Sequence, residues 1–163
     1  GMDGIEKIIK ENSLIKAYKD GKDKEARWNM MMASTEGAMA FSKGLGAVHS
    51  MSHATGANQE LRLHHGTLNA VILPAVLEFN QNHVGNKYSR IARAMGKNDS
   101  INLANEIRKL NENIGIPSGL AEMGVTEDMI PELVTHSITD PSNLTTPRLP
   151  NEEEWEKLFL ESM

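Results

Sequence analysis

The sequence predicts an all-α protein, a helical bundle of about eight helices. Apolar residues recur at helical spacing along most of the chain, and no window alternates between apolar and polar residues for long enough to indicate a strand. Short clusters rich in Gly, Pro, Asn and Asp interrupt the helical pattern. The 163 residues are one domain's worth, so we expect a single helical domain over residues 1–163.

Three helices are expected in the first third of the chain. The first covers residues 5–19, where isoleucines and leucines recur at helical spacing before Asp20-Gly21 stops the helix. The second covers residues 25–41, and its many Ala and Met residues suggest tight packing. Glycines follow it, and a short helix over residues 48–57 comes next.

The middle of the chain contains the most apolar segment. Residues 66–80 are apolar nearly all round, which indicates a central buried helix, and Pro74 should kink it. Two further helices are expected over residues 88–95 and 101–113. Asp99-Ser100 stands where the second of these would need a cap.

The last third predicts a short helix and two longer ones, with a loop between the two longer helices. A short helix should follow residue 116, and a longer one should open at Thr126, with acidic residues in its first turn. Residues 139–150 are expected to form the loop. Asn151 should cap the final helix.

The composition excludes several classes of function. The chain has no cysteine, so it can form neither disulfides nor thiolate metal sites. Its net charge is −5 and it has no basic block, so we expect no nucleic-acid and no membrane partner. The longest apolar stretch, residues 70–77, is too short to span a bilayer. We therefore expect a soluble, cytoplasmic protein.

Four of the six histidines lie within 17 positions: His49, His53, His64 and His65. On a helix, His49 and His53 lie on one face, one turn apart, and a helical hairpin could bring His64 or His65 over them. Imidazole is a ligand for iron, zinc, copper and nickel. Position 50 is Ser, so the H-E-x-x-H metalloprotease motif is absent. The residues alone leave two interpretations open, a metal site or polar side chains on a loop and a half-exposed helix.

The order of these residues adds information. The segment GLGAVHSMSHATG, followed by LHHGTLNAVILPAVLEFN, closely resembles the signature of the iron-containing (group III) alcohol dehydrogenases, relatives of dehydroquinate synthase. The resemblance extends through HVGNKYSRIARAMG to the closing TTPRLPNEEEWEKLF and covers essentially all of the chain. The sequence departs from the common form in having Ala54-Thr55-Gly56 after the second histidine and His64 before His65-Gly66.

The resemblance implies a dehydroquinate synthase-like C-terminal helical domain and a role for three histidines. His49 and His65 would bind a catalytic Fe²⁺ or Zn²⁺ ion. His53 would line the cleft and relay the proton while hydride passes between an alcohol and NAD(P). Family members take a further Asp and His, four residues apart, from an upstream helix, and they bind the dinucleotide in an upstream α/β domain. This sequence contains neither an Asp-x-x-x-His pair nor a G-x-G-x-x-G loop, which predicts half of a metal site.

Two functions follow from the resemblance. The chain is either the C-terminal helical domain of an NAD(P)-dependent alcohol dehydrogenase that interconverts alcohols and aldehydes, inactive alone, or a free-standing, non-catalytic interaction or metal-binding module. A separate nucleotide-binding chain is one of two expected partners. The other is a second copy in a two-fold dimer, through a face with Met30, Met31, Met32, Met39 and Met51. The alternative is a monomer whose first helix covers that face.

Overall fold

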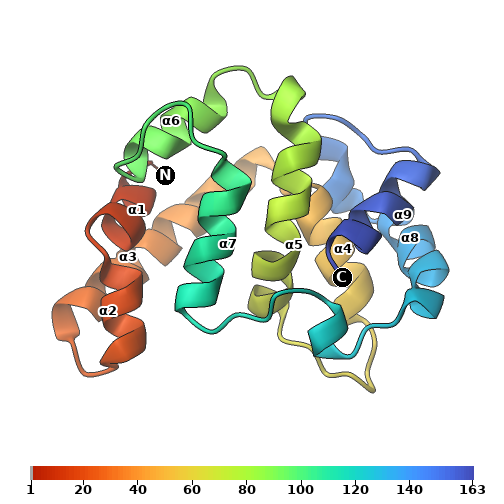
Figure 1. Ribbon diagram of the computed structural model, residues 1–163, viewed down its shortest axis with the longest axis horizontal. Helices are drawn as coiled ribbons and strands as arrows, with labels where there is room; N and C mark the ends of the chain where they lie inside the picture. Colours follow the sequence, from red (N-terminus) through yellow and green to blue (C-terminus); the bar gives the residue numbers. More distant parts are fainter. Residues whose placement is uncertain (1) are drawn as a thin grey trace. The chain divides into compact units, whose positions relative to one another are not determined.

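The computed structural model describes residues 2–163, and in that range the chain is helical and contains no strand. The all-α prediction is confirmed, with nine α-helices in the described residues and short 3-10 or π turns between them. The chain divides into two compact units, one formed by the residues up to Lys43 together with Val84–Asn102, the other by Gly44–His83 together with Leu103–Met163. Figure 1 shows the elements along the chain.

The first unit contains α1 (Met2–Ile5), a π-helical turn (Glu6–Lys10), α2 (Ser13–Lys19), α3 (Lys24–Ala40), a 3-10 turn (Phe41–Lys43) and α6 (Lys87–Ala94). The continuous helix expected over residues 5–19 is wrong. Asn12 takes a left-handed conformation, with φ of 60°, and interrupts it. Asn tolerates this conformation better than most residues, and the buried Ser13 then starts α2.

Helix α3 differs from its prediction in packing rather than in extent. The Asp23 side chain caps its first turn by accepting a hydrogen bond from the Ala26 amide. Ala26 is the residue of α3 that is buried, whereas Trp28, Met31 and Met39 expose 62%, 62% and 73% of their surface. The tight packing inferred from the Ala and Met content is therefore wrong for the described chain.

The second unit is built around α5 (His65–Asn80), which confirms the predicted central helix. It packs against α4 (Ala47–Gly56), α7 (Leu103–Asn113) and α9 (Glu152–Glu161), and α8 (Ile130–Thr139) packs on α4 and α9. Figure 1 shows α5 between α7 and α4. The helix continues through Pro74, which is buried. The largest fully buried apolar side chains of the core are Trp155, Phe159, Met51, Leu68, Ile72, Leu120 and Leu158.

Four further details differ from, refine or confirm the sequence prediction. Helix α7 begins at Leu103, and Asp99, instead of capping it, forms an ion pair with Arg93. Met51, expected on an exposed face, is fully buried. The predicted loop after Thr139 contains a 3-10 helix, Pro141–Thr145. Asn151 caps α9 as predicted, in a capping box with Glu154.

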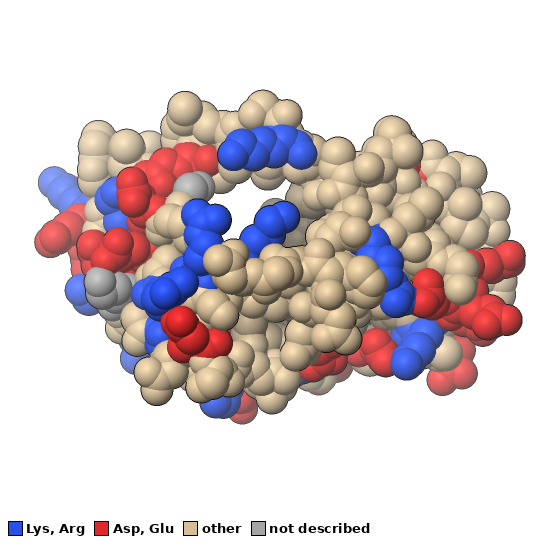
Figure 2. Space-filling model, turned by 90° about the horizontal axis from the view of Figure 1, so that it is seen from above, with Lys and Arg blue, Asp and Glu red and all other residues tan. Residues whose placement is uncertain are grey.

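None of the helices in residues 2–163 is both long enough and apolar enough to cross a membrane. On the face drawn in Figure 2, Lys and Arg side chains stand in small groups, with Asp and Glu side chains near several of them.

Candidate metal centre

Three of the four clustered histidines meet where α4 packs against the start of α5. His49 and His53 lie one turn apart on α4, as predicted, and His65 is the first residue of α5. The ring centres of His49 and His53 are 5.8 Å apart, and that of His65 lies 5.3 Å from each. His64 does not join this imidazole cluster. Its ring caps α5 by accepting a hydrogen bond from the Thr67 amide.

Two side chains hold the His65 ring. Its Nδ1 lies 2.8 Å from the hydroxyl of the fully buried Ser52, and its Nε2 lies 3.0 Å from the amide nitrogen of Asn69. Because an amide nitrogen can only donate, Nε2 must accept, and the ring proton is then on Nδ1, which donates to Ser52. Asn69 Oδ1 is buried without a hydrogen-bond partner among the described residues.

The ring of His53 is held by a carboxylate that the sequence pattern does not reveal. Nδ1 of His53 lies 2.9 Å from Oδ2 of Asp140, and Asp140 Oδ1 accepts from the Ser142 amide at 2.7 Å. Burial acts to raise the pKa of Asp140, but the hydrogen bonds from Ser142 and His53 outweigh it and hold the pKa below its ordinary value. Asp140 is therefore ionised at neutral pH.

The segment that carries Asp140 is anchored at two points. The buried Asn143 donates its amide hydrogens to the carbonyl oxygens of Ser137 and Ile138, both at 2.9 Å, and so ties the turn to the end of α8. On the other side, Gly44 has φ of +94° and lies directly against Thr145, where a Cβ would overlap the threonine side chain. The glycine before α4 therefore lets the Asp140 turn approach the helix that carries His53.

The electrostatics of the imidazole cluster favour a neutral His49. Burial lowers the pKa of His49 below its ordinary value, and positive charge on His65 or His53 lowers it further, while Asp140 acts in the opposite direction. Neutral imidazole is the form that binds metal ions. At neutral pH His49 is thus in the ligating state.

The imidazole cluster fits part of a metal-binding set. Two imidazoles bound to one ion through bonds of about 2.0–2.1 Å have their ring centres roughly 5 Å apart, close to the 5.3 Å between His49 and His65. Within residues 2–163, however, no group of three or more His, Asp or Glu side chains is arranged to hold an ion by itself. The residues present suit iron or zinc as contributors to a larger ligand set.

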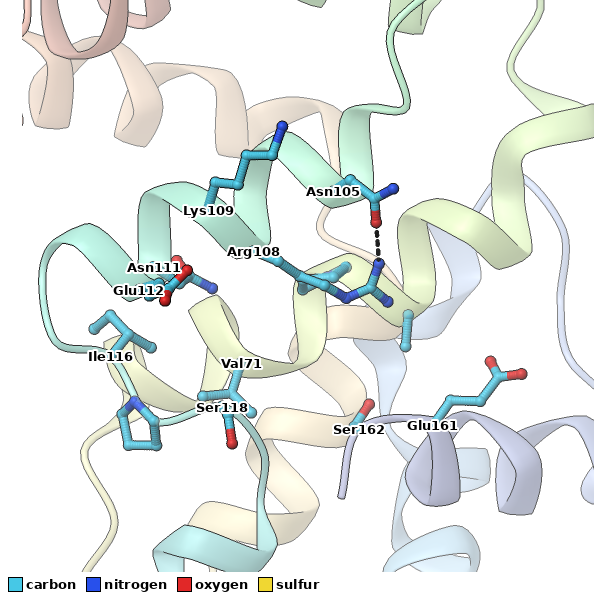
Figure 3. Close-up of a pocket in the computed structure, with 13 residues that line it drawn as sticks. Val71, Asn105, Arg108, Lys109, Asn111, Glu112, Ile116, Ser118, Glu161 and Ser162 are labelled. Carbon is cyan, nitrogen blue, oxygen red and sulfur yellow. Dashed lines mark hydrogen bonds between the residues drawn. The ribbon is translucent and has the colours of Figure 1, made fainter.

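A hollow in this unit lies away from the histidines, between α5, α7 and the end of α9 (Figure 3). It has a volume of about 500 Å³, and Val71, Pro74, Ile116 and Pro117 are among the residues that line it. Arg108 at its edge makes a two-pronged ion pair with Glu78, at 2.7 and 3.2 Å. Lys109 pairs with Glu106. These cations are already neutralised within the chain, so we place the candidate site at the imidazole cluster.

Comparison with known proteins identifies relatives over the whole described chain. The profile of the Fe-containing alcohol dehydrogenase family, C-terminal, matches residues 2–163. Over 169 aligned positions the chain is 40% identical to 4-hydroxybutyrate dehydrogenase of Cupriavidus necator, covering 99% of this chain and 44% of that protein. It is 38% identical to the NAD-dependent methanol dehydrogenase of Bacillus methanolicus, covering 88% of this chain and 39% of that protein.

Solved structures show the same similarity. The fold matches a crystal structure of 1,3-propanediol oxidoreductase with a TM-score of 0.91 and 32% identity, over 99% of this chain and 44% of that one. An alcohol dehydrogenase from Oenococcus oeni matches with a TM-score of 0.91, 28% identity and the same coverage. The chain thus spans less than half the length of the relatives that it matches.

Proposed function

Because the chain belongs to the iron-containing alcohol dehydrogenase family, we propose that it supplies the helical half of a metal-dependent, NAD(P)-linked alcohol dehydrogenase. The observation that carries this proposal is the convergence of His49, His53 and His65 at the α4–α5 junction, with ring centres 5.3–5.8 Å apart.

Each histidine has a distinct part in this proposal. His49 and His65 would hold the ion through imidazole lone pairs, with the remaining ligands and the dinucleotide site supplied by a partner segment. When bound, a divalent iron or zinc ion polarises the alcohol oxygen, and the nicotinamide accepts the hydride. His53 is hydrogen-bonded through Nδ1, so its Nε2 is the atom that can take the alcohol proton.

The names of the relatives suggest a substrate class. They include dehydrogenases for 4-hydroxybutyrate, methanol, butanol and 1,3-propanediol, all of which are primary alcohols. We propose that primary alcohols, or the aldehydes formed from them, are the substrates of the assembled enzyme.

A chimera tests the proposal. The C-terminal segment of the Cupriavidus necator 4-hydroxybutyrate dehydrogenase would be replaced by residues 2–163 of this chain, and NAD(P)⁺ reduction and bound metal would be measured. We expect turnover that His49→Ala and His65→Ala abolish together with metal content. His83→Ala, an exposed histidine outside the imidazole cluster, serves as the matched control and should leave both unchanged.

Two results would change the proposed function. A folded chimera that binds metal through His49 and His65 without turnover would favour the alternative, a non-catalytic metal-binding module. The 163-residue chain alone, supplied with Fe²⁺ or Zn²⁺, should show no NAD(P)-dependent alcohol oxidation, because half of the expected ligand set is missing from its sequence. Turnover by that chain which disappears in His49→Ala would contradict the need for a partner segment.

A further inference from the structure

We propose that Asp140 is the positioning residue for His53, fixing the ring in the Nδ1-protonated tautomer so that Nε2 is the nitrogen that accepts the proton. The inference rests on the proposed function for the role of His53. Its structural part, the tautomer, stands on contacts within this chain and can be tested without metal, cofactor or substrate.

The hydrogen bond between His53 and Asp140 has only one possible direction. A carboxylate can only accept, so at the 2.9 Å distance between Asp140 Oδ2 and His53 Nδ1 the ring nitrogen must donate. The His53 side chain is 42% exposed. Neutral imidazole in water favours the opposite tautomer, with the proton on Nε2. Without Asp140, a ring as exposed as that of His53 would present Nε2 mainly as a donor, which is the wrong form for accepting a proton.

The Asp140 carboxylate is rigidly held. The Asp140 side chain is 16% exposed. Its Oδ1 accepts from the Ser142 amide, while Oδ2 accepts from His53. Asn143 ties the turn to the end of α8, and Thr145 packs on Gly44. The imidazole is therefore oriented by a group whose turn is anchored independently of His53, to the end of α8 and to the segment before α4.

The alcohol proton would move to His53 in a single transfer. The alcohol O–H bond breaks and its proton forms a bond to Nε2 of His53, which makes the ring an imidazolium with a proton on each nitrogen. The Nδ1–H then donates to Asp140 as a charge-assisted hydrogen bond, stronger than the neutral one it replaces. The carboxylate keeps its charge throughout. Asp140 touches neither substrate nor cofactor in this scheme, and it acts through His53.

The tautomer can be read directly by nitrogen NMR of the histidine side chains in the 163-residue chain at neutral pH, without metal. We expect His53 to show a protonated Nδ1 and an unprotonated Nε2. In Asp140→Asn, the new side chain can still cap the turn with its oxygen on the Ser142 amide. Its amide nitrogen then faces His53, which must accept at Nδ1 and carry its proton on Nε2.

The matched control is Asp128→Ala, an exposed acidic residue in the Glu127–Met129 turn, which should leave the His53 spectrum unchanged. Asp140→Ala provides a second variant, whose His53 should show the mixture typical of imidazole in water. Unchanged Nδ1 protonation of His53 in Asp140→Asn, with the protein folded, would overturn the proposal. So would an Nε2–H tautomer in the unmodified chain.

The chimera separates this inference from the proposed function. Asp140→Asn should lower its kcat at least tenfold with little change in KM, because the alcohol still binds while the proton acceptor is in the wrong form. An unchanged kcat alongside a reversed tautomer would overturn the positioning role. If the unmodified chimera has no turnover, the proposed function and the positioning role of Asp140 in the reaction both fail, whereas the NMR result still decides the tautomer.

Discussion

The side-chain amide nitrogen of Asn69 lies 3.0 Å from Nε2 of His65, the ring nitrogen that is left to bind a metal ion once Nδ1 is bonded to Ser52. Asn69 and the ion therefore compete for one lone pair. The hydrogen bond keeps the ring oriented while no ion is bound. It must break when His65 becomes a ligand, and the amide is then free to bond elsewhere.

This competition predicts that Asn69→Ala raises the zinc affinity of the 163-residue chain. A hydrogen bond of this kind contributes about 1 kcal/mol, which corresponds to roughly a fivefold lower Kd. Calorimetric titration with Zn²⁺ would measure the change, with His65→Ala as the variant that loses binding and the exposed Asn113→Ala as the control. Weaker binding in Asn69→Ala would mean that the amide helps to hold the ion.

The state of His49 predicts how stability depends on pH. Its pKa is lowered from 6.5, mainly by burial, so the unfolded chain binds a proton more readily than the folded chain. The contribution of neutral His49 to the free energy of unfolding is fully present above about pH 6.5. It is lost as the pH falls through the lower pKa that His49 has in the folded chain. We expect His49→Gln to lose less stability than the unmodified chain between neutral pH and about pH 5 in chelator. Parallel losses in both proteins would contradict this origin.

The effect of the neighbouring histidines on the pKa of His49 can be tested separately. Because positive charge on His65 and His53 also lowers the pKa of His49, His65→Ala should move that pKa back toward 6.5. An NMR titration of His49 would show the shift. His83→Ala removes a histidine that does not contribute to the lowering of the His49 pKa and should not change the titration. A further lowering of the His49 pKa in His65→Ala would be the opposite of this expectation.

Replacing Gly44 with alanine should destabilise the folded chain. At φ of +94°, alanine is strained by about 1–2 kcal/mol, and its Cβ would in addition overlap Thr145. Gly124, with φ of +90° in the same unit, faces only the end of the flexible Leu61 side chain. We expect Gly44→Ala to lower the free energy of unfolding by at least about 1 kcal/mol more than Gly124→Ala, as measured by urea unfolding. Equal losses would mean that the contact with Thr145 does not constrain the loop.

The sequence predicts those parts of the fold and site that depend on local pattern. The apolar run ending at Asn80 indicates α5, the spacing of His49 and His53 places both rings on one face, and Asn151 marks the start of α9. In each of these cases neighbours within one or two helical turns decide the outcome. Helical periodicity and capping chemistry are sufficient there.

The partners of the imidazole rings could not be predicted in this way. Asp140 is 87 positions from His53 in the sequence, and its Asp-Pro context indicates only the start of a turn. Ser52 is one of many serines until α5 places His65 against it. The break at Asn12 depends on a single left-handed residue inside a good helical pattern. Tertiary packing determines all three, and local periodicity carries no information about it.

The exposed side of helix α3 predicts association of the chain with a second copy. Trp28, Met31 and Met39 lie at helical spacing on one side of α3 and are 62%, 62% and 73% exposed. Large apolar patches of this kind are rare on soluble monomers, and methionine adapts readily to a new surface. We propose that two copies bury this stripe against each other in a two-fold dimer, the commonest closed arrangement. Light scattering at tens of micromolar should then give twice the 18.0 kDa chain mass.

Met31→Glu places a charge in the middle of the stripe and should convert the dimer to a monomer without unfolding the chain, because the side chain is exposed. Leu160→Glu, a substitution of an exposed apolar residue on α9, should leave the mass unchanged. A single 18.0 kDa species from the unmodified chain would contradict the dimer and support a monomer.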